Sequence, residues 1–408
     1  METNKFFEPL LGLHSPFHIS RITHEVNADQ ITAIHIYITV DTNYRPLDSE
    51  GRPGSIHDYE SRQWRHLDLF QYPCYVHCEV PKFRYADGST KTLEVPWARS
   101  KSGFTLLFEV FAIELIKLYG CVAKVARQLD IYSQRLWYLV AYYSKKETAM
   151  PKDLSKVKQI AFDETSKKKG HNYVSIFLNL ETGDLLSVEE GKSAETVTQF
   201  AQVAEEQGLN KENITDVSID FSPAFQAGTK INFINANITF DKFHVSQLVQ
   251  KAMDSCRKSL GRQANQKFNK WLFLKPYSQL NGDQQDELEN LLDEYPQFHQ
   301  LYTLKNDFAI LWKHKQPDEA AAFLAFWIEQ IKELKLKATT TLAKTFEKSF
   351  DGIIQHFRSN INNAILEGFN SKVQTMKRNA RGYKKTETFI TMIRWHCANA
   401  LSQPTQVT

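Results

Sequence analysis

The sequence has little glycine and proline, 16 and 13 residues in 408, and its five cysteines include no Cys-x-x-Cys pair. This composition excludes a long low-complexity linker, and the scattered, odd number of thiols indicates a reducing compartment rather than a disulfide framework. No segment approaches the ~20 apolar residues of a membrane span, and the N-terminus has neither a basic start nor an unbroken apolar run. We therefore expect a cytoplasmic protein that does not contact membranes.

An excess of one charge sign is also absent, because 50 Lys and Arg oppose 47 Asp and Glu for a net charge of +3. Charge is nevertheless segregated along the chain. Residues 251–275 and 371–394 each hold seven cations and one acid, whereas residues 281–300 hold six acids and no Lys or Arg. A nucleic-acid partner requires clustered rather than total positive charge, so the near-neutral sum does not exclude one. Such charge runs are often only solvated helix faces.

The spacing of apolar residues divides the chain into segments with different predicted secondary structure. Short alternating runs separated by turns predict a β module over residues 1–100, and helical spacing with a break at 130–132 predicts a helix-turn-helix within 101–150. Residues 151–246 predict the order β-β-β-α-β-α-β. Residues 247–356 are helical throughout and too long for a loop, 357–400 are helical again, and 401–408 form a tail.

The strand and helix order of 151–246 is that of the ribonuclease-H-like fold, so we predict an α/β catalytic domain interrupted by a large all-α insertion. Three carboxylates stand where such a domain would use them: Asp163 within the first strand, Asp220 at the end of the fourth and Glu367 on a late helix. Unpaired charge in an apolar strand is costly, which favours a function for both aspartates. Glu164 is a rival to Asp163, but strand neighbours face opposite sides, so only one of them can join a single site.

Four motifs in order, AFDETSKKKGHNYVSIFLNLETGDLLSVEEGKSAE, VSIDFSPAF, ITFDKFHVSQLV and LEGFNSKVQTMKRNARGY, resemble the bacterial insertion-sequence transposases of the ISL3 family. The resemblance covers residues from about 64 to 395. It implies a DDE transposase that binds the terminal inverted repeats of an insertion sequence and catalyses strand cleavage and strand transfer. It also implies double-stranded DNA as partner, both element ends and target, and a homodimer or higher oligomer on DNA.

The resemblance assigns catalysis and metal binding to Asp163, Asp220 and Glu367, which would hold two Mg²⁺ or Mn²⁺ ions. Hard cations of this kind prefer oxygen ligands, and two of them can activate one oxygen while stabilising another. Asp241 and His244 match the family's Asp-x-x-His and would support the site. The alternative is an Asp that caps the next helix, with the His packed near it.

Two sets of residues are expected to contact DNA. Near the start of the second helix of the helix-turn-helix, which enters the major groove in such motifs, stand Ser133, Gln134, Arg135 and Tyr138. Phosphate contacts beside the metal site would come from Lys372, Lys377, Arg378, Arg381, Lys384 and Lys385. Helix pairs also occur as plain packing units. We expect Trp271 and Trp312 to be core residues, with base stacking as the alternative.

The N-terminal module departs from the family, whose members usually carry paired Cys-x-x-Cys knuckles that bind zinc. Here Cys74, His77 and Cys78 offer too few ligands for a closed tetrahedral site. We therefore expect a degenerate zinc-ribbon-like module without zinc. This divergence keeps a second interpretation open, a catalytically decayed or domesticated sequence-specific DNA-binding protein. A third, a structure-specific nuclease on the same fold, is disfavoured by the helix-turn-helix and the insertion.

Overall fold

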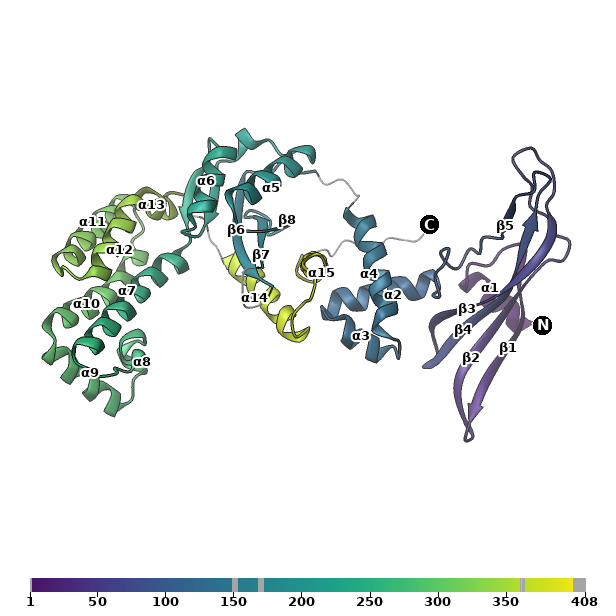
Figure 1. Cartoon of the computed structure of the whole chain (residues 1–408), viewed down its shortest axis with the longest axis horizontal. Coiled ribbons are helices and arrows are strands. Elements are labelled where there is room, and N and C mark those ends of the chain that lie inside the picture. Colours follow the sequence, from purple (N-terminus) through teal and green to yellow (C-terminus); the bar gives the residue numbers. More distant parts are fainter. Residues whose placement is uncertain (1, 149–152, 168–171, 360, 362–363, 399–408) are drawn as a thin grey trace. The chain divides into compact units, whose positions relative to one another are not determined.

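A computed structural model describes residues 2–148, 153–167, 172–359, 361 and 364–398 (Figure 1). Its internal contacts divide the chain into two units, residues 1–146 and 147–408. The fold is mixed α/β, with one sheet in each unit and many helices. Among the described helices, none is long and apolar enough to cross a membrane.

The first unit contains a five-stranded sheet that follows a short helix, α1 (Glu2–Leu10). Its strands are β1 (Phe17–Asn27), β2 (Gln30–Val40), β3 (Ser55–Leu69), β4 (Tyr72–Arg84) and β5 (Thr90–Thr92), in the order β1-β2-β4-β3 with β5 on β4. A tight turn at Ala28 and Asp29, both with positive φ, joins β1 to β2. Trp64, Val76 and Trp97 are buried in the core of this module. The predicted strand-rich region is thus present.

Three helices complete the first unit. They are α2 (Leu106–Tyr119), α3 (Val122–Gln128) and α4 (Ser133–Thr148). Gly120 ends α2 in the left-handed conformation, with φ of 60°, and its N–H donates to the carbonyl of Ile116. A short break between residues 128 and 133 separates α3 from α4 where the sequence predicted it.

The second unit is built on a sheet with the strand order β10-β9-β6-β7-β8. Its strands are β6 (Gln159–Ser166), β7 (Tyr173–Asn179), β8 (Leu185–Glu190), β9 (Asp216–Ile219) and β10 (Asn237–Phe240). Each of the first three runs antiparallel to its neighbour, whereas β9 pairs parallel with β6 and β10 parallel with β9. A short 3-10 helix, Lys211–Asn213, precedes β9. The predicted β-β-β-α-β-α-β order is therefore observed.

Helices cover both faces of this sheet. On one face α5 (Ala194–Glu206) and α6 (Pro223–Asn232) bury aromatic rings against the strands, since ring contacts join Phe162, Phe177, Phe200 and Phe225 into one cluster. On the other face lies α14 (Ala364–Asn379), whose side chains bond to β6. The chain then forms α15 (Thr386–Met392) and a π-helical turn, Ile393–Cys397.

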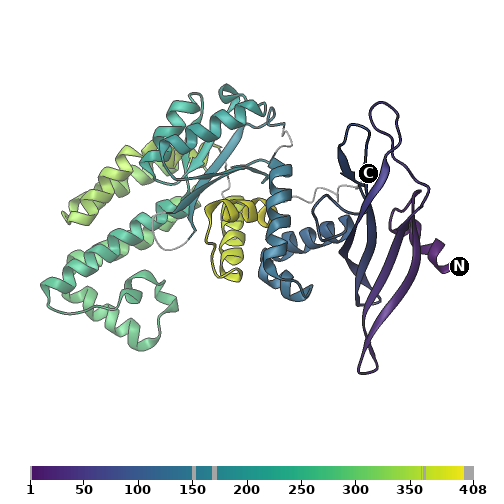
Figure 2. The same cartoon turned by 45° about the vertical axis from the view of Figure 1, so that its right-hand side comes forward.

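Between β10 and α14 the chain is helical, as predicted. The elements are α7 (Lys242–Gln263), α8 (Lys270–Leu274), α9 (Gly282–Glu294), α10 (Pro296–Asp307), α11 (Pro317–Glu333), α12 (Lys337–Lys348) and α13 (Phe350–Ser359), with 3-10 turns at Tyr277–Gln279 and Phe308–Lys313. The long helix α7 leads from the sheet into this segment (Figure 1, Figure 2). Gly352 lets α13 approach β10, because a Cβ there would stand 2.5 Å from the Phe240 ring.

Two apolar cores stabilise the helical segment. One, which includes Trp327 and Phe346, is continuous with the core of the sheet, and the other is centred on Leu272 and Phe273. Trp312 is partly buried against the first core. The expectation that Trp271 is a core residue is wrong, because its side chain is 50% exposed. Leu272 and Phe273 already present the buried face of α8, so the preceding residue points outward.

Candidate active site

The sheet brings Asp163 and Asp220 together. Strands β6 and β9 are parallel and pair Ala161 with Ser218, and the same register continued by two residues sets Asp163 beside Asp220. Asp220 directly follows the last residue of β9, and its charge is close enough to Asp163 to raise the pKa of that carboxyl. Two predicted site residues 57 positions apart in sequence therefore become neighbours through parallel pairing.

Short hydrogen bonds orient both carboxylates. The Ser222 N–H donates to Asp220 Oδ1 at 2.8 Å, where the chain turns from β9 into α6. The Glu164 N–H donates to Asp163 Oδ1 at 2.7 Å. Each aspartate has one carboxylate oxygen held by the backbone next to it, which fixes the direction of the other oxygen.

The two carboxylates are electrostatically disfavoured as ions. The pKa of Asp163 is raised to about 6, chiefly by burial and also by the charges of Asp220 and Glu164, while His244 and the Glu164 N–H oppose the change. Burial also raises the pKa of Asp220. Desolvated like charges of this kind are typical of functional sites, because a bound cation relieves them.

Helix α14 is attached to β6 by three side chains on one helical face. Asn370 Nδ2 donates to Asp163 Oδ2 at 2.7 Å, Gln374 Nε2 to Thr165 Oγ1 at 3.0 Å, and Lys377 Nζ to the Ser166 carbonyl at 2.7 Å. Sequence reasoning did not single out Asn370 as a site residue. Its position three residues after Glu367, one helical turn on, is the signal that could have identified it.

Glu367 lies on the same helix but is not in contact with the two aspartates. Its side chain is exposed, and within the described part of the chain it forms no hydrogen bond or ion pair. Residues three apart on a helix share a face, so Glu367 lies one helical turn before Asn370, the residue that bonds Asp163. The structure brings together two members of the predicted triad and carries the third on the helix that bonds Asp163.

Glu164 has a different partner from the two aspartates, although its charge is close enough to raise the pKa of both. It is ion-paired with Lys192, whose Nζ is 3.0 Å from Oε1. The side chain of Phe162, on the same side of β6, is buried in the core beneath α5 and α6. The alternation predicted for this strand is observed, and it assigns Asp163 rather than Glu164 to the face that α14 covers.

Asp241 and His244 have different surroundings. Asp241 is buried and caps α7, because its Oδ1 accepts the Phe243 N–H at 2.7 Å. The capping alternative for Asp241 is therefore what the structure shows. His244, one turn into α7, lies close enough to both aspartates to lower the pKa of each.

The donor set can be compared with what a divalent cation requires. Among the described residues, no group of three or more His, Cys, Asp and Glu side chains is arranged to hold a metal ion. The two aspartates are accompanied by the buried amide oxygen of Asn370, which has no hydrogen-bond partner within the described residues. Carboxylate and amide oxygens are the ligands that hard cations prefer, so these three side chains fit such an ion.

The cations on α14 and in the segment that follows it differ in whether their side chains are bonded to β6 or exposed. Lys377 is bound to the Ser166 carbonyl, and burial lowers its pKa. Exposed side chains are presented by Lys372, Arg378, Arg381, Lys384 and Lys385. The buried Lys167 donates from the neighbouring strand end to the Lys384 carbonyl and to Thr386. Part of the positive charge predicted for DNA therefore joins the C-terminal segment to β6.

The predicted recognition residues of α4 also divide into two kinds. Ser133, Gln134 and Tyr138 are exposed on the first turns of the helix. Arg135 is also exposed, but it donates to the Gly103 carbonyl at 3.1 Å, and its guanidinium lies 4.3 Å from the centre of the Phe104 ring. Arg135 thus packs α4 onto the segment before α2.

The cysteines of the β module lie in its core. Burial raises the pKa of Cys74 to about 11 and that of Cys78 to about 12, so both thiols are protonated near neutral pH. His77 points to the opposite face of β4 and hydrogen-bonds His35 at 2.9 Å. Alternation along the strand separates the histidine from the two cysteines.

Comparison with known proteins identifies the family of the chain. Residues 160–393, more than half of the chain, match the ISL3 family of DDE transposases, described as "Transposase". The chain belongs to this ISL3 family of insertion-sequence transposases. Residues 50–87 also match the zinc-finger of transposase IS204/IS1001/IS1096/IS1165. That description conflicts with our expectation that the module lacks zinc. Within the matched range, Cys74 and Cys78 are buried in an apolar core.

Curated relatives match over most of their length. The transposase for insertion sequence element IS1001 of Bordetella parapertussis is 25% identical over 354 residues, covering 83% of this chain and 85% of the relative. The transposase for insertion sequence element IS1557 of Mycobacterium tuberculosis, in strains CDC 1551 / Oshkosh and ATCC 25618 / H37Rv, is 21% identical over 382 residues, covering 84% and 83%. The family resemblance predicted from the motifs is confirmed.

Proposed function

We propose that this chain is an active DDE transposase that binds the terminal inverted repeats of its element and catalyses metal-dependent DNA strand cleavage and strand transfer. The observation that carries the proposal is the proximity of Asp163 on β6 and Asp220 directly after the parallel strand β9, with raised pKa values. The strand order, three antiparallel strands followed by two on the other side of the first, supports a ribonuclease-H-like catalytic domain. The intact carboxylates disfavour the decayed or domesticated alternative.

In this proposal Asp163 and Asp220, with Glu367, hold Mg²⁺ or Mn²⁺. When bound, such ions activate an attacking oxygen and stabilise a leaving one. The Ser222 N–H and the Asn370 amide keep the two aspartates oriented before DNA arrives. Glu367 is exposed on the site side of α14, so it can join the aspartates through a change of its own rotamer and small motions of the helix.

DNA contacts are assigned to two regions. Exposed Ser133, Gln134 and Tyr138 at the start of α4 are proposed to read the terminal repeats as part of a helix-turn-helix formed by α3 and α4. The exposed cations after Glu367 are proposed to contact phosphates next to the cleavage site. A homodimer or larger assembly would hold two element ends. We also propose that the domains of the chain end at residues 100, 150, 246, 356 and 400.

An excision assay tests the proposal with Asp163→Asn, Asp220→Asn and Glu367→Gln. Each variant should lose excision by at least ~10³-fold, because removing one carboxylate from a metal-binding triad removes a ligand rather than a contact. Glu164→Gln tests the rival carboxylate of the same strand, which is paired with Lys192 and whose charge raises the pKa of both aspartates. On the proposed assignment it should lose far less activity than the triad variants, because it removes a neighbouring charge and not a metal ligand. Full activity in any triad variant removes that residue from the metal site.

A further inference from the structure

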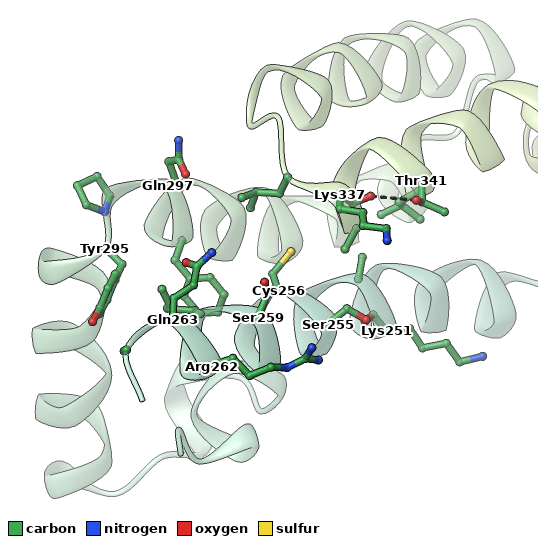
Figure 3. A pocket seen from close by; sticks show the side chains of 18 of the residues that line it. Lys251, Ser255, Cys256, Ser259, Arg262, Gln263, Tyr295, Gln297, Lys337 and Thr341 are labelled. Carbon is green, nitrogen blue, oxygen red and sulfur yellow. Dashed lines mark hydrogen bonds between the residues drawn. The ribbon is translucent and has the colours of Figure 1, made fainter. Parts of the chain in front are cut away.

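A cavity of about 960 Å³ opens in the helical segment, and none of its lining residues belongs to the candidate active site. Its walls are α7, α12 and the junction of α9 with α10 (Figure 3). Figure 3 shows Ser259 and Arg262 on α7, Lys337 and Thr341 on α12, and Tyr295 at the junction. The volume is at the upper end of ligand-binding cavities, ~300–1,000 Å³.

The lining of this cavity combines apolar and polar surface. Cys256, Phe298 and Leu342 are buried side chains that form part of its wall. Hydroxyl and amide groups stand around them, from Ser255, Ser259, Thr341, Thr345, Gln263 and Gln297. A surface of this kind suits a ligand with both apolar planes and hydrogen-bonding groups.

The cavity is also positively charged. Its cations are Lys251, Arg262 and Lys337, which are exposed and form no ion pair within the described residues. By contrast, Arg257 and Lys258 of the same α7 are neutralised by Asp254, each at 2.6 Å. Of the six acids in residues 281–300, only Glu294 lines the cavity.

The spread of the cations indicates the class of ligand. Lys251 and Arg262 are eleven residues apart on one helix, which at 1.5 Å per residue separates their backbones by ~16 Å. One phosphate cannot reach both, whereas a DNA strand places a phosphate every ~3.4 Å along its axis. The distribution therefore fits a polyanion that runs along α7.

We propose that this cavity binds the sugar–phosphate backbone of a DNA strand, with the three cations at separate phosphates along it and a base against Tyr295 and the apolar wall. Other proteins bind single-stranded DNA with the same combination of a cationic groove and an aromatic or apolar surface on which bases stack. The inference rests on the proposed function, that the chain acts on DNA. It adds a second contact region, on the helical segment rather than on α4 or after α14.

The test uses the full-length chain and fluorescence anisotropy with two labelled probes, an oligo(dT) strand and a mixed-sequence duplex. The cavity triple variant is Lys251→Gln, Arg262→Gln, Lys337→Gln. The matched control is Lys313→Gln, Lys315→Gln, Lys344→Gln, which removes the same charge from exposed residues of the same segment that do not line the cavity. Thermal melting of all three proteins checks that the fold is unchanged.

The cavity triple should bind oligo(dT) roughly tenfold more weakly than wild type, with a log–log salt slope less steep by about 2, and the control should change by less than about twofold. Equal losses in the two triples, or no loss in the cavity triple, overturn the inference. So does a cavity triple that keeps its DNA affinity but loses self-association in light scattering, because the cavity then serves a protein interface. A wild-type chain that binds neither probe contradicts the proposed function itself.

Discussion

The side-chain amide of Asn370 donates a hydrogen bond to the carboxylate of Asp163, with 2.7 Å between Nδ2 and Oδ2, across 207 residues of sequence. This bond joins the helix that carries Glu367 to the strand that carries the first aspartate. It leaves the buried amide oxygen of Asn370 without a partner in the described structure. The relationship makes Asn370 the side chain that connects the two halves of the proposed metal site.

We expect Asn370→Ala to lower excision by roughly 10–100-fold and to raise the Mg²⁺ concentration needed for half-maximal activity, since losing a group that orients a metal ligand has effects of this size. Titration of the excision rate with Mg²⁺ measures both quantities. Gln374→Ala is the matched control, because it removes only the bond to Thr165 one turn further along α14. An unchanged Mg²⁺ requirement in Asn370→Ala would show that the bond serves packing alone.

The metal-free chain should be destabilised by ionisation of Asp163. Its pKa is raised from 3.8 to about 6 by burial, so between these values the folded chain keeps a proton that the unfolded chain has released. The free energy of unfolding therefore falls as pH rises from about 4 to 6, by up to roughly 3 kcal/mol. Asp163→Asn should be more stable than wild type at pH 8 in EDTA and no more stable at pH 4, as measured by urea unfolding. Equal stability at both pH values would contradict the assignment.

The two kinds of residue on α4 should separate stability from DNA binding. Arg135→Ala removes the bond to the Gly103 carbonyl and the contact with Phe104, so it should lower the unfolding free energy of the first unit by ~1–2 kcal/mol. Gln134→Ala and Tyr138→Ala change exposed side chains and should leave stability within ~0.5 kcal/mol while weakening binding to element-end duplex. Thermal melting and gel-shift assays together decide between these roles.

A buried ionic network holds α2 to its neighbours and is independent of the catalytic proposal. Glu109 is fully buried, accepts two hydrogen bonds from Arg99 at 2.6 and 2.8 Å, and accepts the Tyr143 hydroxyl at 2.8 Å. Glu109→Ala leaves the Arg99 guanidinium without its partner and should lower the unfolding free energy by ~3–5 kcal/mol.

The control for Glu109 is Glu114→Ala on the same helix, whose exposed carboxylate pairs with Lys117 at 3.4 Å. It should change stability by less than ~1 kcal/mol, because solvent screens such pairs. Denaturant unfolding of the two variants measures the difference. A mild effect of Glu109→Ala would indicate that Arg99 finds another acceptor.

The sequence by itself determined the order of strands and helices, the family and the positions of the two aspartates. Strand alternation and helical spacing are local patterns, so β6 could be predicted with Asp163 and Glu164 on opposite faces. The ordered motifs identified the family because a motif is matched residue by residue along the sequence. Neither inference needs to know which distant residues meet.

Only the tertiary structure decided which side chains meet. The parallel register of β6 and β9 sets Asp163 beside Asp220, and the packing of α14 on β6 uses Asn370 and Lys377 as contacts with the strand. It likewise turned Asp241 into a helix cap and exposed Trp271. These outcomes depend on contacts between segments up to about 200 residues apart. Local periodicity carries no information about such contacts, because burial and hydrogen bonding are settled only when the elements pack.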